Sequence, residues 1–207
     1  MPKVSAIVWD MDGTLIDSAT AVPATFAALV AELGGPSVDT SAVEAAYPLG
    51  IPEVILARLL GRSLREGEGD LYYKRLRTAK IRPYPGVREA LAAMHGRWPT
   101  GIFTGSSQAA AVISISIAGL ADLLPVVVGG DQVNRPKPAP DGILMACRRL
   151  GQSPADVAYV GDSPTDLLAA RAAGAVAVAA GWGHLYSAEA AADFTLTAPG
   201  QVCDLLA

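Results

Sequence analysis

The sequence predicts an α/β protein in which a parallel sheet carries helices on both faces and a small all-helical segment follows the first strand. Three patterns lead to this fold class. Residues 4–9 form an apolar run of strand length. Residues 15–83 show only helical spacing of their apolar side chains. From residue 84 onward, short apolar strands alternate with helices, which is typical of a parallel sheet covered on both faces.

The individual elements follow from the same spacing and from the glycine- and proline-rich breaks between them. In the inserted segment we expect helices at residues 19–33, 40–47, 52–60 and 69–80. In the alternating part we expect helices at residues 87–95, 107–117, 140–150 and 164–173. The strands between them are expected at residues 99–103, 125–128, 157–160 and 175–179. The chain therefore divides into an α/β core domain, residues 1–14 and 84–207, and a helical cap domain, residues 15–83.

Composition limits the classes of function. With 207 residues, 51% hydrophobic and 17% charged, the chain can bury the core of one large domain or of a domain with an insertion. Its net charge of −4 provides no general attraction for nucleic acid or for an anionic membrane. No segment approaches the roughly 20 uninterrupted apolar residues of a membrane span. The early Asp10 leaves no room for a signal peptide, so we expect a cytoplasmic protein. The oligomeric state stays open.

The cysteines and histidines suggest no metal site of their own. Cys147 and Cys203 lie far apart and lack the spacing of a zinc site or a disulfide framework. His95 and His184 are remote in sequence from the polar motifs, so we interpret both as surface or packing residues. The roles of Asp131 and of the glycine-rich loop at residues 181–184 stay open.

Polar residues follow four of the predicted strands. The strand ends read "WDMDGT", "IFTGSS", "GGDQVNRPKP" and "YVGDSPTD". Ligands of open parallel sheets bind at the carboxyl ends of the strands, so these residues are expected to share one site. The candidate residues are Asp10, Asp12, Thr104, Gly105, Lys137, Asp162 and Asp166.

Phosphoryl transfer through a carboxylate uses this set of groups. Asp10 can attack phosphorus, while Asp12 protonates the leaving oxygen and later activates water. Two neighbouring carboxylates at the end of a buried strand need a cation, and hard oxygen ligands with a phosphate substrate indicate Mg²⁺. Asp162 is expected to be a further metal ligand beside Asp10 and Asp12, with Asp166 as its orienting partner. Thr104, Gly105 and Lys137 are expected to hold the phosphate.

These motifs resemble the haloacid dehalogenase superfamily of aspartate-nucleophile phosphatases. Residues 10–14, "DMDGT", match its first motif, Thr104 the second, Lys137 in "KPAPDG" the third and "GDSPTD" the fourth. The resemblance covers the whole chain in order and spacing. It implies a Rossmann-like core, Asp10 as nucleophile, Asp12 as acid and base with its main-chain carbonyl on magnesium, and Asp162 as metal ligand. A helical insertion after the first motif looks like the cap of phosphoglycolate phosphatases, and "GDSPTDLLAARAAGAVAVAAGWG" is similar to that branch.

Single positions separate the alternatives within the family. Dehalogenases and phosphonate-cleaving relatives lack the second aspartate, so Asp12 argues against both. β-Phosphoglucomutases carry an arginine three residues after a loop glycine, whereas Glu53 stands at that offset from Gly50 here. A catalytically silent binding protein is a further alternative, although no motif carboxylate is missing.

The substrate is expected to be a small phosphomonoester, because a helical cap over the sheet edge encloses a small chamber. We favour 2-phosphoglycolate, with a sugar phosphate as the second candidate. The turn "YPLGIP", which contains Gly50, resembles the specificity loop of the family. Its side chains are mostly apolar, so Arg58 is our candidate for contacting a substrate carboxylate. Pairing of Arg58 with an acid of the cap is the alternative.

Overall fold

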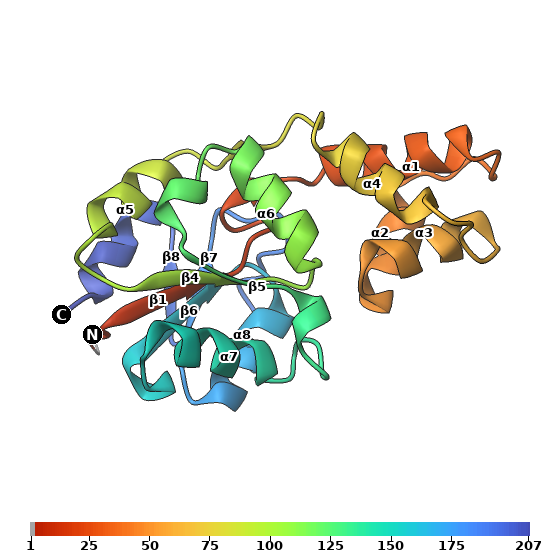
Figure 1. Ribbon diagram of the computed structural model, residues 1–207. Coiled ribbons are helices and arrows are strands. Elements are labelled where there is room, and N and C mark those ends of the chain that lie inside the picture. The colour runs from red at the N-terminus through yellow and green to blue at the C-terminus, as the bar shows by residue number, and fades with distance from the viewer. Residues whose placement is uncertain (1–2) are drawn as a thin grey trace.

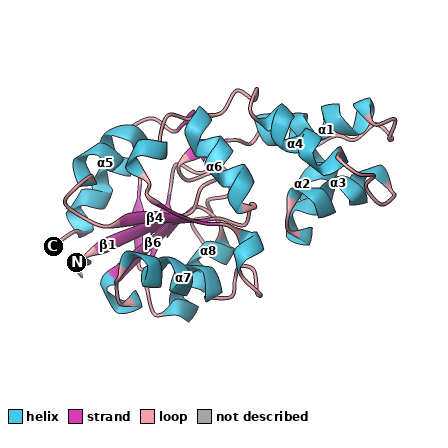
Figure 2. Ribbon diagram, viewed as in Figure 1, coloured by secondary structure: helices cyan, strands magenta, loops and turns pink. Residues whose placement is uncertain are grey.

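A six-stranded parallel sheet forms the centre of the protein in the computed structural model, which describes residues 3–207 (Figures 1 and 2). The strand order is β5-β4-β1-β6-β7-β8. The strands are β1 (Ala6–Trp9), β4 (Thr100–Phe103), β5 (Val126–Val128), β6 (Val157–Gly161), β7 (Val176–Ala180) and β8 (Phe194–Leu196). The predicted fold class is confirmed. The short strand β8 was not predicted.

Strand β1 lies inside the sheet because it is apolar on both faces. It pairs in parallel with β4 and with β6. Ile7 and Trp9 point into one hydrophobic cluster, whereas Ala6 and Val8 point into the other, as the alternation of side chains along a strand requires. The residues that follow β1 therefore emerge in the middle of the carboxyl edge of the sheet.

Helices cover both faces of the sheet. On one face lie α5 (Val87–Met94), α6 (Gln108–Ile117) and the 3₁₀-helix η5 (Pro199–Leu205), and on the other lie α7 (Asp141–Leu150) and α8 (Pro164–Ala173) (Figure 1). Short 3₁₀-helices occur in the connections: η2 (Ala121–Leu123), η3 (Gly130–Gln132) and η4 (Pro154–Asp156). Within residues 3–207, no helix combines the length and the apolar character needed to cross a membrane.

Four helices stand between the two-residue strands β2 (Ile16–Asp17) and β3 (Arg82–Pro83); we call them the four-helix insertion. They are α1 (Ala21–Glu32), α2 (Thr40–Ala46), α3 (Pro52–Leu60) and α4 (Glu68–Leu76), with the 3₁₀-helix η1 (Tyr47–Leu49) after α2. Figure 2 shows them beyond one end of the sheet. The predicted end of the last helix at Lys80 is wrong. After Leu76 the chain forms tight turns, in which the amides of Thr78 and Ala79 donate to carbonyls three residues earlier.

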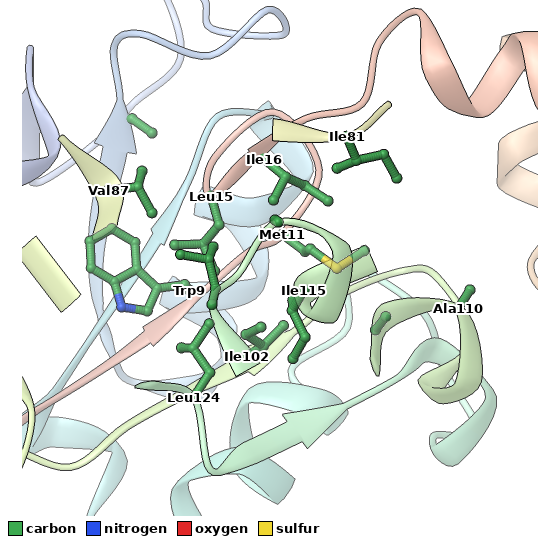
Figure 3. Close-up of a cluster of buried hydrophobic side chains, with 14 of the residues drawn as sticks. Trp9, Met11, Leu15, Ile16, Ile81, Val87, Ile102, Ala110, Ile115 and Leu124 are labelled. Carbon is green, nitrogen blue, oxygen red and sulfur yellow. The ribbon is translucent and has the colours of Figure 1, made fainter. Parts of the chain in front are cut away.

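The chain leaves the core and returns to it at one place. β2 and β3 form an antiparallel pair in which Ile16 faces Pro83. In Figure 3 Ile16 and Ile81 lie in the same buried cluster as Met11 and Trp9. The start and the end of the insertion are thus anchored beside the residues that follow β1.

A polar contact made by the second half of α4 joins the insertion to the core. The Tyr73 hydroxyl lies 3.2 Å from Oγ of Ser107, which caps the start of α6, and 2.8 Å from Oε1 of Glu53. Helix α4 is therefore held against α6 at the carboxyl edge of the sheet.

Candidate active site

The turn after β1 positions the two aspartates of the first motif. The Asp10 amide donates to the carbonyl of Val160 on β6 (2.8 Å), so Asp10 continues the strand pairing by one residue. The Met11 carbonyl then accepts from the amides of Leu15 (2.9 Å) and Ile16 (3.0 Å). Because the chain turns back on itself there, the side chains of Asp10 and Asp12 remain at the sheet edge.

Lys137 connects the first and the fourth motifs. Its Nζ lies 2.6 Å from Oδ1 of Asp10 and 2.6 Å from Oδ1 of Asp166. Burial lowers the pKa of Lys137, but the two carboxylates outweigh it and raise the pKa well above its ordinary value, so the ammonium stays charged. Burial raises the pKa of Asp10; Lys137 lowers it, while Asp166 and Asp162 raise it again.

The oxygens of Asp166 are fully used by the protein itself. Oδ1 accepts from Lys137 and from the Tyr159 hydroxyl (3.2 Å), while Oδ2 accepts from the amide (3.0 Å) and the hydroxyl (2.6 Å) of Ser163. Asp166 is 1% exposed. These bonds hold Lys137 and the start of α8 in place, which agrees with an orienting role for Asp166.

Asp10 and Asp162, by contrast, each keep an oxygen free. Within residues 3–207, Oδ2 of Asp10 accepts no hydrogen bond, and Oδ1 of Asp162 is buried without a partner. One carboxylate oxygen from each of Asp10, Asp162 and Asp166 lies within 4.8 Å of the other two. A buried oxygen with no donor beside other carboxylates suits a hard divalent cation, so the residues present fit Mg²⁺. The Asp12 carboxylate is not part of this group.

Two glycines provide room for the Asp162 side chain because they have no Cβ. A Cβ on Gly13, whose φ is +83°, would lie 2.3 Å from Oδ2 of Asp162, and a Cβ on Gly183 would lie 2.2 Å from its Cβ. The amide of Leu185, two residues beyond Gly183, donates to the same Oδ2 (2.9 Å). The loop after β7 therefore packs directly against the fourth motif.

Gly183→Ala is expected to destabilise the protein by about 1–3 kcal/mol, the usual cost of overpacking, because the new methyl group meets Asp162 and the Gly13 carbonyl. Thermal unfolding measures the change. Gly200→Ala is the matched control, since a Cβ there meets no atom within 4 Å. Equal unfolding midpoints for both variants would contradict this packing.

Asp12 is held in a different way from Asp10. Its carboxylate is half-buried and accepts a 2.5 Å hydrogen bond from the Ser18 hydroxyl. Burial raises the pKa of Asp12, although Ser18 and Lys137 act to lower it. A raised pKa favours a carboxyl group that can carry a proton to a leaving group near neutral pH.

The end of β4 presents free donors to the site. Thr104 is buried, and its Oγ1 accepts from the Ser106 amide (3.1 Å). The Gly105 amide has no acceptor within residues 3–207. Gly130 packs so closely on this turn that a Cβ there would lie 2.5 Å from the Gly105 carbonyl. The turn is thus closely packed, and its free amide is available to bind an anion.

A cavity of about 350 Å³ joins these groups to the insertion. From the core it is lined by six of the seven candidate residues: Asp10, Asp12, Thr104, Gly105, Lys137 and Asp166. From the insertion it is lined mostly by apolar and aromatic side chains, among them Val22, Phe26, Ile55 and Tyr72. Asp162 lies beside this cavity and contacts its lining residue Leu185.

The weaker sequence candidates separate in space. Gly50 lines the cavity, whereas Arg58 is exposed on α3 and is not among the lining residues. His184, interpreted above as a surface or packing residue, lines the cavity with Nδ1 4.0 Å from Oδ2 of Asp162. Its position directly after β7, at the carboxyl edge, was the signal that could have identified it. Asp131 accepts from the Gln108 amide at the start of α6 (2.8 Å).

Comparison with known proteins identifies the family. The family model of haloacid dehalogenase-like hydrolases matches residues 4–174. The chain belongs to this family. Proteins similar to it in sequence include a phosphoglycolate phosphatase of Chromobacterium violaceum, 30% identical over 100% of this chain and 98% of that protein. An N-acetylmuramic acid 6-phosphate phosphatase of Pseudomonas aeruginosa is 31% identical over 99% of this chain and 95% of that protein.

Solved structures with the same fold cover nearly the whole chain. CbbY from Rhodobacter sphaeroides, in complex with phosphate, superimposes with a TM-score of 0.80 at 23% identity, covering 96% of each chain. A predicted phosphoglycolate phosphatase from Haemophilus somnus superimposes with a TM-score of 0.78 at 21% identity, covering 99% of each chain. The predicted family and activity class are confirmed. This haloacid dehalogenase-like hydrolase is a phosphatase, which hydrolyses phosphoric monoesters. Hydrolases of this family generally use Mg²⁺, which agrees with the buried acidic group.

Proposed function

We propose that the protein is a magnesium-dependent phosphatase that hydrolyses a small phosphomonoester through an aspartyl phosphate on Asp10. The observation that carries this proposal is the free Oδ2 of Asp10 beside the cavity, while Lys137 holds Oδ1 at 2.6 Å. One oxygen is fixed by a cation and the other is left for attack, as a nucleophilic carboxylate requires.

In the first step the Asp10 oxygen forms a bond to phosphorus and the ester P–O bond breaks. Asp12 transfers its proton to the leaving alcohol oxygen. In the second step the Asp12 carboxylate removes a proton from water, whose oxygen bonds to phosphorus while the bond to Asp10 breaks. Asp10 returns as a carboxylate and inorganic phosphate leaves, so both residues regain their initial states.

The remaining candidates bind the phosphate and the metal in this proposal. Thr104, the Gly105 amide and Lys137 contact the phosphate oxygens. A bound Mg²⁺, held by Asp10, Asp162 and the Asp12 main-chain carbonyl, supplies positive charge that offsets the repulsion between the Asp10 carboxylate and the phosphate dianion. Asp166 orients Lys137.

We also propose that residues 15–83 act as a cap domain over residues 1–14 and 84–207. The support is the cavity between the four-helix insertion and the sheet edge, together with the short β2–β3 pair through which the chain enters and leaves the insertion. A cavity of about 350 Å³ suits a compact phosphomonoester rather than a nucleic acid.

The names of the relatives supply two compounds for a substrate panel, 2-phosphoglycolate and N-acetylmuramic acid 6-phosphate. Sugar phosphates complete it. Phosphate release from p-nitrophenyl phosphate and from this panel tests the proposed activity with the purified protein. The absence of release from every ester in the presence of Mg²⁺ would contradict the proposed function and favour a binding protein.

Chelation of divalent cations is expected to stop phosphate release, and added Mg²⁺ is expected to restore it. Ca²⁺ should inhibit, because its larger and looser coordination disturbs the positions of Asp10 and Asp162. Calorimetric titration of the metal-free protein with Mg²⁺ provides a readout that does not depend on turnover. Asp162→Asn should lose that binding, whereas Asp17→Asn, at an exposed position of β2, should retain it. Full activity in excess chelator would refute the metal requirement.

A further inference from the structure

The part of the cavity formed by the insertion contains an unusual polar group. Tyr72 of α4 lines the cavity, although only 2% of the residue is exposed. Its ring stacks on Phe26 of α1, with centroids 4.5 Å apart and ring planes 28° from parallel. Among residues 3–207 the Tyr72 hydroxyl makes no hydrogen bond, and it does not belong to the buried polar atoms that are closed off from solvent, so it is open to the cavity. The hydroxyl of the next residue, Tyr73, contacts Glu53 and Ser107.

A hydroxyl that is open to the cavity and unpaired within the protein can form a hydrogen bond with a bound ligand in place of water. Burial raises the pKa of Tyr72, and the charge of Asp12 raises it further, so the hydroxyl stays protonated and can donate. Tyr72 and Asp12, the group that serves the leaving oxygen of the substrate, line the same cavity.

Charge in the cavity disfavours a second anionic group on the substrate. Among the described lining residues, Lys137 is the one Lys or Arg, and Asp10 and Asp166 already engage it. The lining also contains Asp12 and Glu44, which would repel a substrate carboxylate. The remaining basic residue of the lining, His184, lies against Asp162.

We propose that the insertion side of the cavity binds an uncharged, hydroxyl-bearing organic group of the phosphomonoester, and that the Tyr72 hydroxyl is its hydrogen-bond partner. The stacked rings of Tyr72 and Phe26 provide an apolar wall for the carbon atoms of this group. The inference rests on the proposed function, because it names the class of ester that the same site hydrolyses.

Three esters of similar size test the inference: 2-hydroxyethyl phosphate, n-propyl phosphate and 2-phosphoglycolate. The first differs from the second by a hydroxyl in place of a methyl group, and from the third by an uncharged end in place of a carboxylate. We expect kcat/KM for 2-hydroxyethyl phosphate to exceed that for 2-phosphoglycolate at least about tenfold, since an unpaired charge is poorly tolerated in an apolar site.

Tyr72→Phe retains the ring and removes only the hydroxyl. It should lower the ratio of kcat/KM for 2-hydroxyethyl phosphate over n-propyl phosphate about tenfold, the effect of one hydrogen bond. Tyr73→Phe is the matched control and should leave the ratio unchanged. Because the readout is a ratio, a change in the folded fraction does not affect it. A preference for 2-phosphoglycolate, or a ratio that Tyr72→Phe does not change, would overturn the inference.

Binding separates a failure of the inference from a failure of the proposed function. The dissociation constants of the same esters are measured on Asp10→Asn protein, with and without Tyr72→Phe. If the wild-type protein releases no phosphate but Tyr72→Phe still lowers the binding ratio about tenfold, the subsite stands and the proposed function is wrong. If phosphate is released but neither ratio responds to Tyr72→Phe, the proposed function stands and the subsite is wrong.

Discussion

Asp10→Asn is expected to abolish phosphate release while the protein stays folded. An amide nearly preserves the volume of the carboxylate but cannot supply the anionic nucleophile, so kcat should fall about 10⁴-fold or more. The variant also removes the buried carboxylate whose pKa Asp166 and Asp162 raise, while Lys137 keeps its contact with Asp166. Steady-state phosphate release and thermal unfolding measure the two effects separately.

Asp17→Asn is the control for this variant, because it makes the same change at an exposed aspartate of β2. It should retain wild-type turnover. Acid quenching of the wild-type protein during turnover should reveal a protein species heavier by one phosphoryl group, and Asp10→Asn should not form it. Near-normal activity of Asp10→Asn with magnesium would show that the aspartyl-phosphate mechanism does not operate here.

Asp12→Asn is expected to slow both chemical steps, by roughly 10²- to 10⁴-fold, the range of general acid and base catalysis. The loss should depend on the leaving group. An alkyl phosphate needs a proton on its leaving oxygen, whereas p-nitrophenolate leaves without one, so the alkyl ester should suffer more in the first step. With p-nitrophenyl phosphate the slow second step should instead let the phosphorylated protein accumulate, which mass spectrometry of quenched samples detects.

Ser18→Ala provides a graded comparison with Asp12→Asn. It removes the hydroxyl that donates to Asp12 but leaves the carboxyl group. Its loss of kcat should therefore be much smaller, and the phosphorylated protein should not accumulate. If Asp12→Asn lowered kcat equally for alkyl and aryl esters, and no phosphorylated protein accumulated, the role of Asp12 as acid and base would be contradicted.

Much of the core fold could be predicted because its signals are local. Short apolar strands alternating with helices predict a parallel sheet, and α3 and α8 begin and end at the predicted residues 52–60 and 164–173. β2, β3 and β8 were missed because each has only two or three residues and includes a polar side chain, so none forms an apolar run as β5 does. Each exists only because a distant segment pairs with it, as Ile16 does with Pro83.

The candidate site divides in the same way. Asp10, Asp12, Thr104 and Lys137 could be predicted, because each follows a strand and such strands end at one edge of a parallel sheet. The distances between their side chains could not be predicted. That Lys137 lies between Asp10 and Asp166 depends on the order of β5, β4, β1 and β6 in the sheet and on the cap of α8.

The sequence by itself determined the chemical groups of the site, because the residue types and their places after successive strands are written in the chain. Only the tertiary structure decided what surrounds them. It set Gly183 and Leu185 against Asp162, turned Tyr72 and Phe26 towards the cavity and left Arg58 in solvent. The physical reason is that local spacing specifies a helix and its apolar face, whereas the neighbour of that face depends on packing between segments far apart in the chain.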